Sequence, residues 1–320
     1  MRGLIAIDWG TSNLRASLLD AHAGVVEARS APGGVMKVKD GLYAPELLGL
    51  CGDWIDQGMG ALIASGMIGS RQGWKEAPYL HCPAGLTEAA SQLKRVQVKP
   101  GVDLSIVPGL TCIGADGEHD VMRGEETQLW GAALPPGSCC VLPGTHSKWA
   151  WIGSGGAVES FATYITGELY GLLTQHGILG RLMRFGESHT ESFEAGVRLG
   201  LDHHANATHV IFSARTAGLM GRISAEGLPD YLSGILLGVE IGSARSATRT
   251  LGGSAAAGLT NGVFLLGDDD LCARYDAALR LAGLSSTRVD DGATTRGQWL
   301  VAQQAGLVRQ ASWAQALTTH

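Results

Sequence analysis

The sequence predicts an α/β fold with two lobes, and two observations support this prediction. Two segments, residues 5–15 and 140–149, share one pattern in which an apolar strand runs into a Gly-Thr turn and then into another apolar strand. In both, a Gly-containing turn and a third strand that reaches a glutamate come next. A chain of 320 residues also suits two domains that each bury a core. We therefore expect two related sheets, one in each lobe.

Apolar runs and turn residues predict the elements of the first lobe in order. The expected strands are residues 4–7, 14–19, 25–29, 61–65 and 104–107, of which the first three form a meander with Gly-containing turns. Apolar residues three and four apart predict a helix that opens at Pro45, and a second helix is expected at 87–94. A polar Gly/Asp stretch at 114–119 predicts the boundary, so the two lobes would span residues 1–115 and 116–320.

The second lobe is expected to begin with a helix at 125–133, followed by the second Gly-Thr hairpin. Its later helices are predicted at 167–173, 231–241 and 271–281, with a strand at 262–267 between the last two. Gly267 therefore stands between a strand and a helix, an arrangement that offers an anion or nucleotide site at the helix N-terminus.

Composition excludes several classes of protein. A net charge of −6 argues against nucleic acid or an anionic membrane as a partner, and no apolar run approaches the ~18 residues of a membrane span. No signal peptide is recognisable, so a soluble cytoplasmic protein is expected. The six cysteines show no C-x-x-C spacing and are predicted to be reduced, mostly buried thiols. Forty-seven glycines indicate many tight turns.

The two Gly-Thr turns are suited to holding phosphate. Glycine lets the backbone approach an anion, successive N–H groups point at its oxygens, and a Thr or Ser hydroxyl adds a donor. No P-loop, G-x-G-x-x-G, G-x-S-x-G or H-E-x-x-H motif is present in the sequence. Two phosphate-holding hairpins across a cleft therefore indicate an ATP-dependent enzyme of another class.

These residues carry a family resemblance. The run Asp8-x-Gly10-Thr11-Ser12-x-x-Arg15 resembles the first phosphate loop of sugar kinases in the actin, hexokinase and heat-shock ATPase superfamily. Gly124-Glu125 followed by a helix and then Gly144-Thr145 is similar to the order found in FGGY carbohydrate kinases. Four blocks, in family order, resemble the signature blocks of 2-dehydro-3-deoxygalactonokinases: residues 8–11, 66–74, 120–128 and 142–149.

The resemblance implies a two-lobed actin-like (ribonuclease H-like) ATPase fold with a cleft between the lobes. It also implies phosphoryl transfer from ATP to the 6-hydroxyl of 2-dehydro-3-deoxy-D-galactonate, with Mg²⁺. Asp8 is then the metal partner, acting through water. The residues assigned to ATP and its phosphates are Gly10, Thr11, Ser12, Asn13, Arg15, Gly144, Thr145, His146, Ser147, Lys148 and, for adenosine, Gly267. Plainer alternatives are an Asx-turn at Asp8, ordinary hairpins at the two turns and a surface arginine at Arg15.

Glu125 is the predicted base for the hydroxyl proton, because it opens a helix and an ordinary glutamate is ionised at pH 7. Glu126 lies about 100° away around that helix, so both cannot face the cleft. Because FGGY kinases have Asp at this point, Asp120 is a competing candidate. Charge compensation at the helix N-terminus is the alternative for the two glutamates.

A sugar acid needs a cation for its carboxylate. Arg71 is the first choice, in a loop flanked by glycines, and Arg123 and Lys75 come next. Gln72 and Trp74 of the same loop are assigned to the sugar acid. The three acids after Gly267 depart from the usual glycine-rich pattern, which leaves nucleotide preference open.

Other functions remain in competition with the kinase. A phosphatase or exopolyphosphatase-like hydrolase, another sugar kinase of the same fold, and a structural or chaperone ATPase are the alternatives. The predicted partners are small molecules, the sugar acid and ATP. Homo-oligomerisation and the choice between galactonate- and gluconate-derived acids are left open by the sequence.

Overall fold

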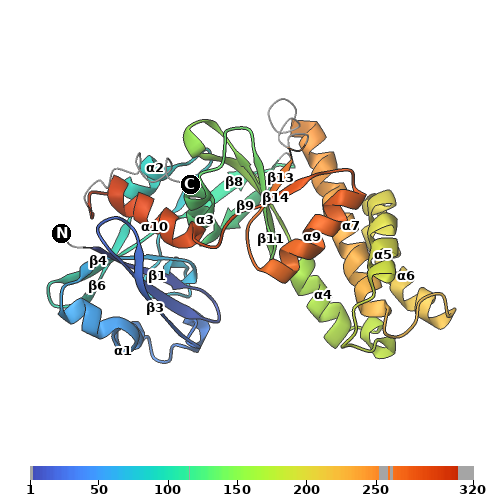
Figure 1. The fold of residues 1–320 in the computed structure, drawn as a ribbon, viewed down its shortest axis with the longest axis horizontal. Helices are drawn as coiled ribbons and strands as arrows, with labels where there is room; N and C mark the ends of the chain where they lie inside the picture. The colour runs from blue at the N-terminus through green and yellow to red at the C-terminus, as the bar shows by residue number, and fades with distance from the viewer. Residues whose placement is uncertain (1–2, 115, 252–258, 260–261, 309–320) are drawn as a thin grey trace.

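A computed structural model describes residues 3–114, 116–251, 259 and 262–308 of the chain. In these ranges the strands form three sheets, of six, five and three strands. Figure 1 shows the six-stranded sheet on the N-terminal side, the five-stranded sheet towards the other side, and the small sheet between them.

The six-stranded sheet contains the first Gly-Thr turn. Its spatial order is β3 (Val25–Ala31), β2 (Leu14–Leu19), β1 (Gly3–Trp9), β4 (Gly60–Ser65), β7 (Val102–Ile106) and β6 (Lys94–Lys99). Strands β1, β4 and β7 are parallel. Strand β1 is buried on both faces: Leu4 and Ala6 join a central core, and Ile5, Ile7 and Trp9 pack in a second core with helix α1 (Tyr43–Asp56). This explains its continuous apolar run.

The five-stranded sheet repeats this order around the second Gly-Thr turn. Its strands are β12 (Val158–Tyr164), β11 (Ser147–Ile152), β10 (Cys139–Leu142), β13 (Val263–Leu265) and β14 (Ser286–Arg288), and β10, β13 and β14 are parallel. In both sheets the strand that enters the Gly-Thr turn lies between its own antiparallel hairpin and two later parallel strands. This duplicated ribonuclease H-like order confirms the predicted two-part α/β fold.

The small sheet joins the two halves. It consists of β5 (Tyr79–His81), β8 (Gly109–Ile113) and β9 (His119–Met122). In the stretch predicted as the lobe boundary, residues 114 and 116–118 lie between β8 and β9, and the Gly114 N–H donates to the Glu118 carbonyl at 2.8 Å. Apolar residues of this sheet belong to the central core, which also contains residues of both large sheets. The division of the lobes at residue 115 stays a prediction.

Three helices lie beside the small sheet (Figure 1): α2 (Leu86–Ser91), α3 (Glu125–Ala132) and α10 (Ala293–Gln304). Helix α10 comes late in the chain but contacts α2, α3, β1 and β4. A Cβ on Gly131 of α3 would lie 1.8 Å from the Ala293 carbonyl oxygen, and one on Gly297 of α10 would lie 1.8 Å from that of Thr127. These glycines permit close helix packing, so the interpretation of the many glycines as turns covers only part of them.

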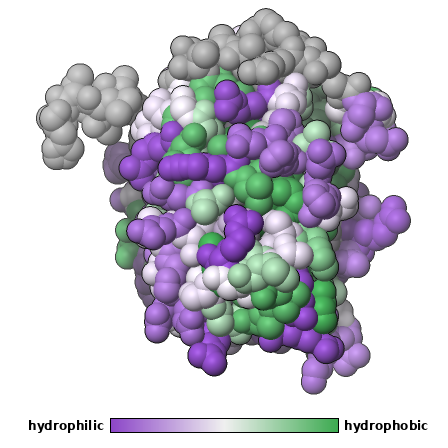
Figure 2. All heavy atoms as spheres, turned by 90° about the vertical axis from the view of Figure 1, so that its right-hand side faces the viewer, coloured by the Kyte–Doolittle hydropathy of each residue, from purple (hydrophilic) through white to green (hydrophobic). Residues whose placement is uncertain are grey.

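The helices of the second half lie on the side of the five-stranded sheet that faces away from the six-stranded sheet (Figure 1). They are α4 (Thr166–Gln175), α5 (Thr190–Asp202), α6 (Ala207–Leu219), α7 (Leu228–Leu251) and α9 (Asp269–Leu281). Figure 2 shows this side of the molecule, where apolar side chains gather among polar ones. Phe185, which precedes α5, Phe212 of α6 and Met220, which follows α6, are exposed. Among the helices in the described ranges, none has the length and apolar character to cross a membrane.

One predicted element is wrong at its end. The helix expected at 87–94 stops at Ser91, and Lys94 begins β6. Val96 and Val98 alternate with polar residues and pack in the core beside α1, so the strand period and the pairing with β7 override the helical pattern. The six cysteines are free and all but Cys82 are buried, as predicted.

Candidate active site

The first Gly-Thr loop, residues 10–13, connects β1 to β2. The Gly10 N–H donates to the Asn13 carbonyl at 3.0 Å, and Thr11, Ser12 and Asn13 are exposed. Asp8 and Arg15 pair in register across the hairpin, and their side chains form an ion pair of 3.2 Å. The predicted metal partner and the predicted phosphoryl-binding arginine therefore lie together at the base of this loop.

A short segment, residues 33–35, supports the first loop from the side. The N–H groups of Gly34 and Val35 donate to the Ser12 and Gly10 carbonyls, both at 3.0 Å. A Cβ on Gly34 would lie 2.0 Å from the Thr11 carbonyl oxygen. Only glycine at this position lets the segment approach the loop so closely, because any side chain would collide with its backbone.

The second Gly-Thr loop, residues 144–147, is supported by helix α4. The Glu168 N–H donates to the Thr145 carbonyl at 2.9 Å, and a Cβ on Gly167 would lie 2.4 Å from the Gly144 carbonyl oxygen. His146 is exposed and pairs with the Glu168 carboxylate. Nothing lies within 4 Å of the position a Cβ would take on Gly144, so this part of the loop is open to a ligand.

Residues at the end of the second loop point in two directions. Ser147 is buried, and its hydroxyl donates to the Glu240 carboxylate of α7 at 2.9 Å. Lys148 is also buried, and its Nζ lies 3.4 Å from Glu125 Oε1. The second loop is therefore tied to the predicted base by an ion pair between β11 and α3.

Glu125 also lies near Asp8. The backbone of Gly66, just after β4, lies between them. A Cβ built on Gly66 would lie 3.5 Å from Asp8 Oδ1, and a Cβ built on Gly124, the neighbour of Glu125, would lie 3.2 Å from Gly66 Cα. Burial raises the pKa of Asp8, the Glu125 charge raises it further, and the Arg15 guanidinium opposes both. The structure thus brings Asp8, Arg15, Glu125 and Lys148 together.

The other two candidate acids lie elsewhere. Glu126 is fully buried, and it accepts hydrogen bonds from the Gly124 N–H and the Thr127 hydroxyl. Burial, and secondly the charge of Glu125, raises the pKa of Glu126 to about 8. Asp120 on β9 accepts from the Thr163 N–H at 3.0 Å and lines a separate cavity beside β12.

The loop predicted to hold the sugar acid lies on the first half of the molecule. Arg71 is 88% exposed, with its Nε 3.7 Å from Glu76, and Gln72 and Lys75 are exposed too. Trp74 stacks on Tyr43 with ring centroids 5.9 Å apart, and the Tyr43 hydroxyl donates to the Gln72 carbonyl. These contacts shape the loop, and none of them joins it to Glu125.

Arg123, in contrast, is buried under that loop. Its Nη2 donates to the Ala77 carbonyl at 2.9 Å, and its guanidinium lies 4.2 Å from the Tyr79 ring centroid. Its Nε and Nη1 have no hydrogen-bond partner within the part of the chain that the structure describes. A buried cation with unused donors is a candidate partner for an anion.

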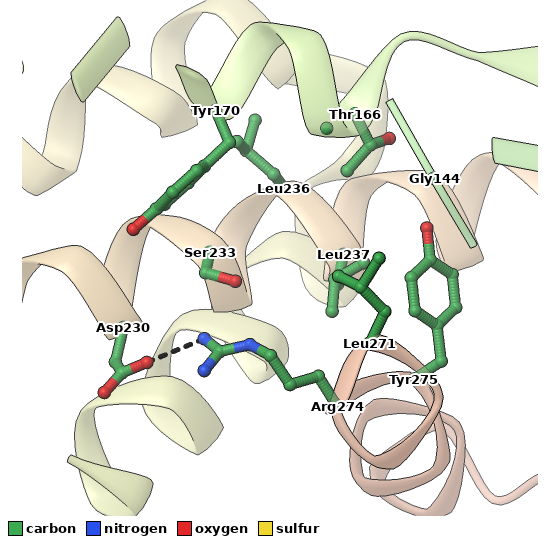
Figure 3. Close-up of a pocket in the computed structure, with 11 residues that line it drawn as sticks. Gly144, Thr166, Tyr170, Asp230, Ser233, Leu236, Leu237, Leu271, Arg274 and Tyr275 are labelled. Atoms are coloured by element: carbon green, nitrogen blue, oxygen red, sulfur yellow. Dashed lines mark hydrogen bonds and ion pairs between the residues drawn. The ribbon is translucent and has the colours of Figure 1, made fainter. Parts of the chain in front are cut away.

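A cavity of about 290 Å³ opens beside the second loop (Figure 3). Gly144 and Thr166 lie at one end of it together with Tyr275, and Tyr170 and Asp230 lie at the other. The Arg274 guanidinium donates to Asp230 at 2.7 Å. A largely apolar cavity with a few polar groups at its wall is typical of a small-molecule site.

Gly267 takes a φ of 153° between β13 and α9, and its carbonyl accepts from Arg288 at 3.0 Å. Two of the three acids that follow it have structural partners. Asp268 caps α9 by accepting from the Asp270 and Leu271 N–H groups, and Asp269 pairs with Arg288. Their departure from a glycine-rich pattern is thus explained by helix capping and an ion pair.

Sequence reasoning missed two buried residues that support these loops. Gln298 of α10 donates to the Ile7 carbonyl and to the Ser65 hydroxyl, which fixes β1 to β4 directly behind Asp8. Glu240 accepts from Ser147, and the sequence held a signal for it, since it is a lone acid in the apolar run 235–241. No local pattern singles out Gln298.

The donor set is compatible with magnesium held mainly through water and phosphate. No cluster of three or more His, Cys, Asp or Glu side chains suitable for a metal occurs among the residues the structure describes. Mg²⁺ commonly keeps several waters and uses one or two carboxylates together with phosphate oxygens. The partly exposed Asp8 carboxylate beside an open phosphate loop fits that mode of binding.

Several known proteins are similar to this chain over most of its length. A model of the 2-keto-3-deoxy-galactonokinase family matches residues 8–301. The chain is 37% identical over 286 residues to the 2-dehydro-3-deoxygalactonokinase of Escherichia coli K12. This alignment covers 89% of this chain and 92% of the relative. It is 36% identical over 303 residues to a probable 2-dehydro-3-deoxygalactonokinase of Rhizobium meliloti, with 89% and 91% covered.

One solved structure is similar along almost its whole length. It is a Sinorhizobium meliloti protein proposed to be a 2-dehydro-3-deoxygalactonokinase, with a TM-score of 0.81 and 33% sequence identity. The match covers 95% of this chain and 98% of that one.

Proposed function

Because the chain belongs to the 2-keto-3-deoxy-galactonokinase family, we propose that it transfers the γ-phosphoryl group of ATP to the 6-hydroxyl of 2-dehydro-3-deoxy-D-galactonate. The enzyme is a phosphotransferase that acts on an alcohol group. The observation that carries the assignment of its site is the position of Glu125, which lies beside Asp8 of the first half and Lys148 of the second.

Glu125 is the proposed base. Its carboxylate accepts a hydrogen bond from the backbone N–H of Arg123 at 3.0 Å and pairs with Lys148, so its orientation is fixed before a substrate arrives. As the acceptor hydroxyl attacks the γ-phosphorus, its proton passes to Glu125, and the bond from the γ-phosphorus to the bridging oxygen breaks so that ADP leaves. Asp120 is the weaker candidate, because its carboxylate is engaged by β12 in another cavity.

The two Gly-Thr loops are proposed to hold the phosphates through backbone N–H groups and the exposed Thr11, Ser12 and Thr145 hydroxyls. Arg15 and Lys148 provide positive charge at the transferring group. Asp8 would hold Mg²⁺, which, when bound, neutralises charge on the phosphate oxygens. The cavity beside Gly144 is the proposed place of the nucleoside, with Gly267 near the start of α9.

For the carboxylate of the sugar acid we propose a cation in the 66–77 loop or directly beneath it. Arg71 is supported by its exposure and by its place in a Gly-flanked loop, and Arg123 by two buried side-chain nitrogens that have no partner among the described residues. Gln72, Trp74 and Lys75 would line the same side of the substrate. We further propose a cytoplasmic enzyme, and a homo-oligomer remains open.

The function is tested by ADP release in a coupled assay with a panel of sugars and sugar acids. We expect release that depends on a 2-keto-3-deoxy sugar acid and on Mg²⁺, with phosphate found on the acceptor's primary hydroxyl. Rapid ADP release with no acceptor would instead indicate a hydrolase of the same fold.

The carboxylate partner is tested separately by Arg71→Ala and Arg123→Lys. If Arg71 binds the acid, Arg71→Ala raises the KM for the acid about tenfold or more while kcat and Tm stay near native. If Arg123 binds it, Arg123→Lys shows that rise instead, because lysine keeps the charge but loses the planar, bidentate donors.

A further inference from the structure

Glu240 is an unusual residue in the second half of the molecule. It is 1% exposed on α7, and apolar residues surround it in the sequence and in the core beside the five-stranded sheet. A buried carboxylate costs several kcal/mol unless it is paired or well hydrogen-bonded. Some contact in this region must therefore offset that cost.

Among the residues that the structure describes, the side chains that donate to Glu240 are all neutral. The Ser147 hydroxyl donates at 2.9 Å, the Trp149 indole N–H at 2.7 Å, and the Tyr275 hydroxyl lies 3.0 Å from both carboxylate oxygens. The Thr166 side chain adds a further hydrogen bond. The carboxylate is thus the common acceptor of four side chains.

These four donors come from the elements that build the proposed nucleotide site. Ser147 ends the second Gly-Thr loop, Trp149 follows it on β11, Thr166 begins α4 and Tyr275 lies on α9. Thr166 and Tyr275 also line the cavity, at the same end as Gly144 (Figure 3). One buried carboxylate therefore connects the loop to two walls of the cavity.

We propose that Glu240 is a positioning residue for nucleotide binding, which holds the second Gly-Thr loop in register with the cavity walls. The inference rests on the proposed function, since it assumes that this loop and cavity take the nucleotide. Its physical reason is pre-organisation: a loop already fixed in its binding geometry loses less conformational freedom when the ligand binds.

The test is a set of variants, measured for KM of ATP, KM of the acid, Tm, and ADP binding by calorimetry. Glu240→Gln keeps the shape but removes the charge and turns one acceptor into a donor. We expect its KM for ATP and its Kd for ADP to rise about tenfold, which is the size expected for one hydrogen bond to a charged group. Its KM for the acid should stay within about twofold.

Ser147→Ala removes the hydrogen bond to Glu240 from the loop side, and it keeps the proposal testable if Glu240→Gln does not fold. It should weaken ADP binding in the same direction, and the double variant should be no worse than the stronger single one, because both remove one interaction. Thr174→Val is the matched control. It removes a buried hydroxyl that bonds only within α4, so it should lower Tm without changing ADP binding.

A merely structural Glu240 would give a different result. Glu240→Gln and Ser147→Ala would then lower Tm while leaving ADP affinity native, or raise both KM values equally, and either outcome overturns the inference. Failure of the proposed function has its own signature, which is a native enzyme that binds ADP but shows no acid-dependent ADP release.

Discussion

The two Gly-Thr loops occupy the same place in two sheets of the same strand order, yet they are supported in different ways. The first is held by an ion pair within its own hairpin, Asp8 with Arg15, and by hydrogen bonds from the backbone of the 33–35 segment to the loop backbone. The second is held by side chains of three other elements, with Glu125 of α3 on Lys148, Glu168 of α4 on His146 and Glu240 of α7 on Ser147.

This difference shows how a repeated fold can divide two tasks. The first loop carries a charged pair within its own hairpin, where phosphate and metal binding are proposed. The second loop is joined by buried charges to the proposed base on one side and to the proposed nucleotide cavity on the other. Changes to the partners of the second loop should therefore alter catalysis, while changes to the 33–35 segment that supports the first loop should act on local folding.

The largest effect is expected from Glu125→Gln, which removes the partner of Lys148 and the proposed base together. We expect kcat to fall about 10²- to 10⁴-fold, with both KM values within a few-fold of native. Steady-state kinetics with a Tm control would measure this. Asp120→Asn is the matched variant, and it should retain most of kcat; the reverse pattern would transfer the role of base to Asp120.

A second large effect concerns Glu126, directly behind that pair. The pKa of Glu126 is raised from 4.5 to about 8 by burial, so the folded protein holds a proton that the unfolded chain releases. Its contribution to stability is complete below about pH 4.5 and falls as pH rises to about 8, by at most about 5 kcal/mol.

Glu126→Gln keeps the neutral shape at every pH. Its Tm relative to the native protein should therefore increase between pH 5 and pH 8. Thermal unfolding at a series of pH values would measure this difference, and a Tm difference that does not change with pH would contradict the assigned protonation state.

A smaller effect is expected where the first loop is supported. Gly34→Ala places a Cβ 2.0 Å from the Thr11 carbonyl, so the segment must move and Tm should fall by several degrees, for a cost of about 1–3 kcal/mol. Gly33→Ala is a close control, because its Cβ would meet only a Glu46 oxygen at 4.0 Å. Equal loss in both variants would show that the close approach does not matter.

The smallest effect on stability is expected inside the loops themselves. A Cβ on Gly10 or Gly144 finds almost open space, so Gly10→Ala and Gly144→Ala should keep a native Tm. If phosphate oxygens approach the backbone at these points, both variants should nevertheless raise the KM for ATP severalfold. A native KM in one variant alone would show that only the other loop holds the triphosphate.

The sequence predicted the elements whose signals are local. The first hairpin, strand β2 with its bounds, the helix that starts at Glu125 and the later strand–helix pair around Gly267 all appear in the structure. It did not indicate β5, β8 and β9 as a sheet, because short strands are defined only by their partners. Helix α10 was missed for a similar reason, since it packs against β1, almost 300 residues earlier in the chain.

The candidate site was recovered in the same uneven way. Asp8, Arg15, Glu125 and Lys148 came from motifs, and the structure places them together. Arg71 and the residues around it were placed in one loop, but their relation to the sugar acid stays a prediction. Gln298 and Glu240 entered only through the structure, because their functional meaning lies in which distant atoms they contact.

By itself, then, the sequence determined the two glycine-threonine hairpins and the chemistry they serve, because hydrogen bonding within a turn and strand alternation depend on neighbours along the chain. Tertiary structure alone decided that Glu125 forms the ion pair with Lys148 and that Glu126 is buried with a raised pKa. It also decided how the Glu240 carboxylate joins the second loop to the cavity. Burial and close contact set these properties, and both depend on segments brought together from far apart in the sequence.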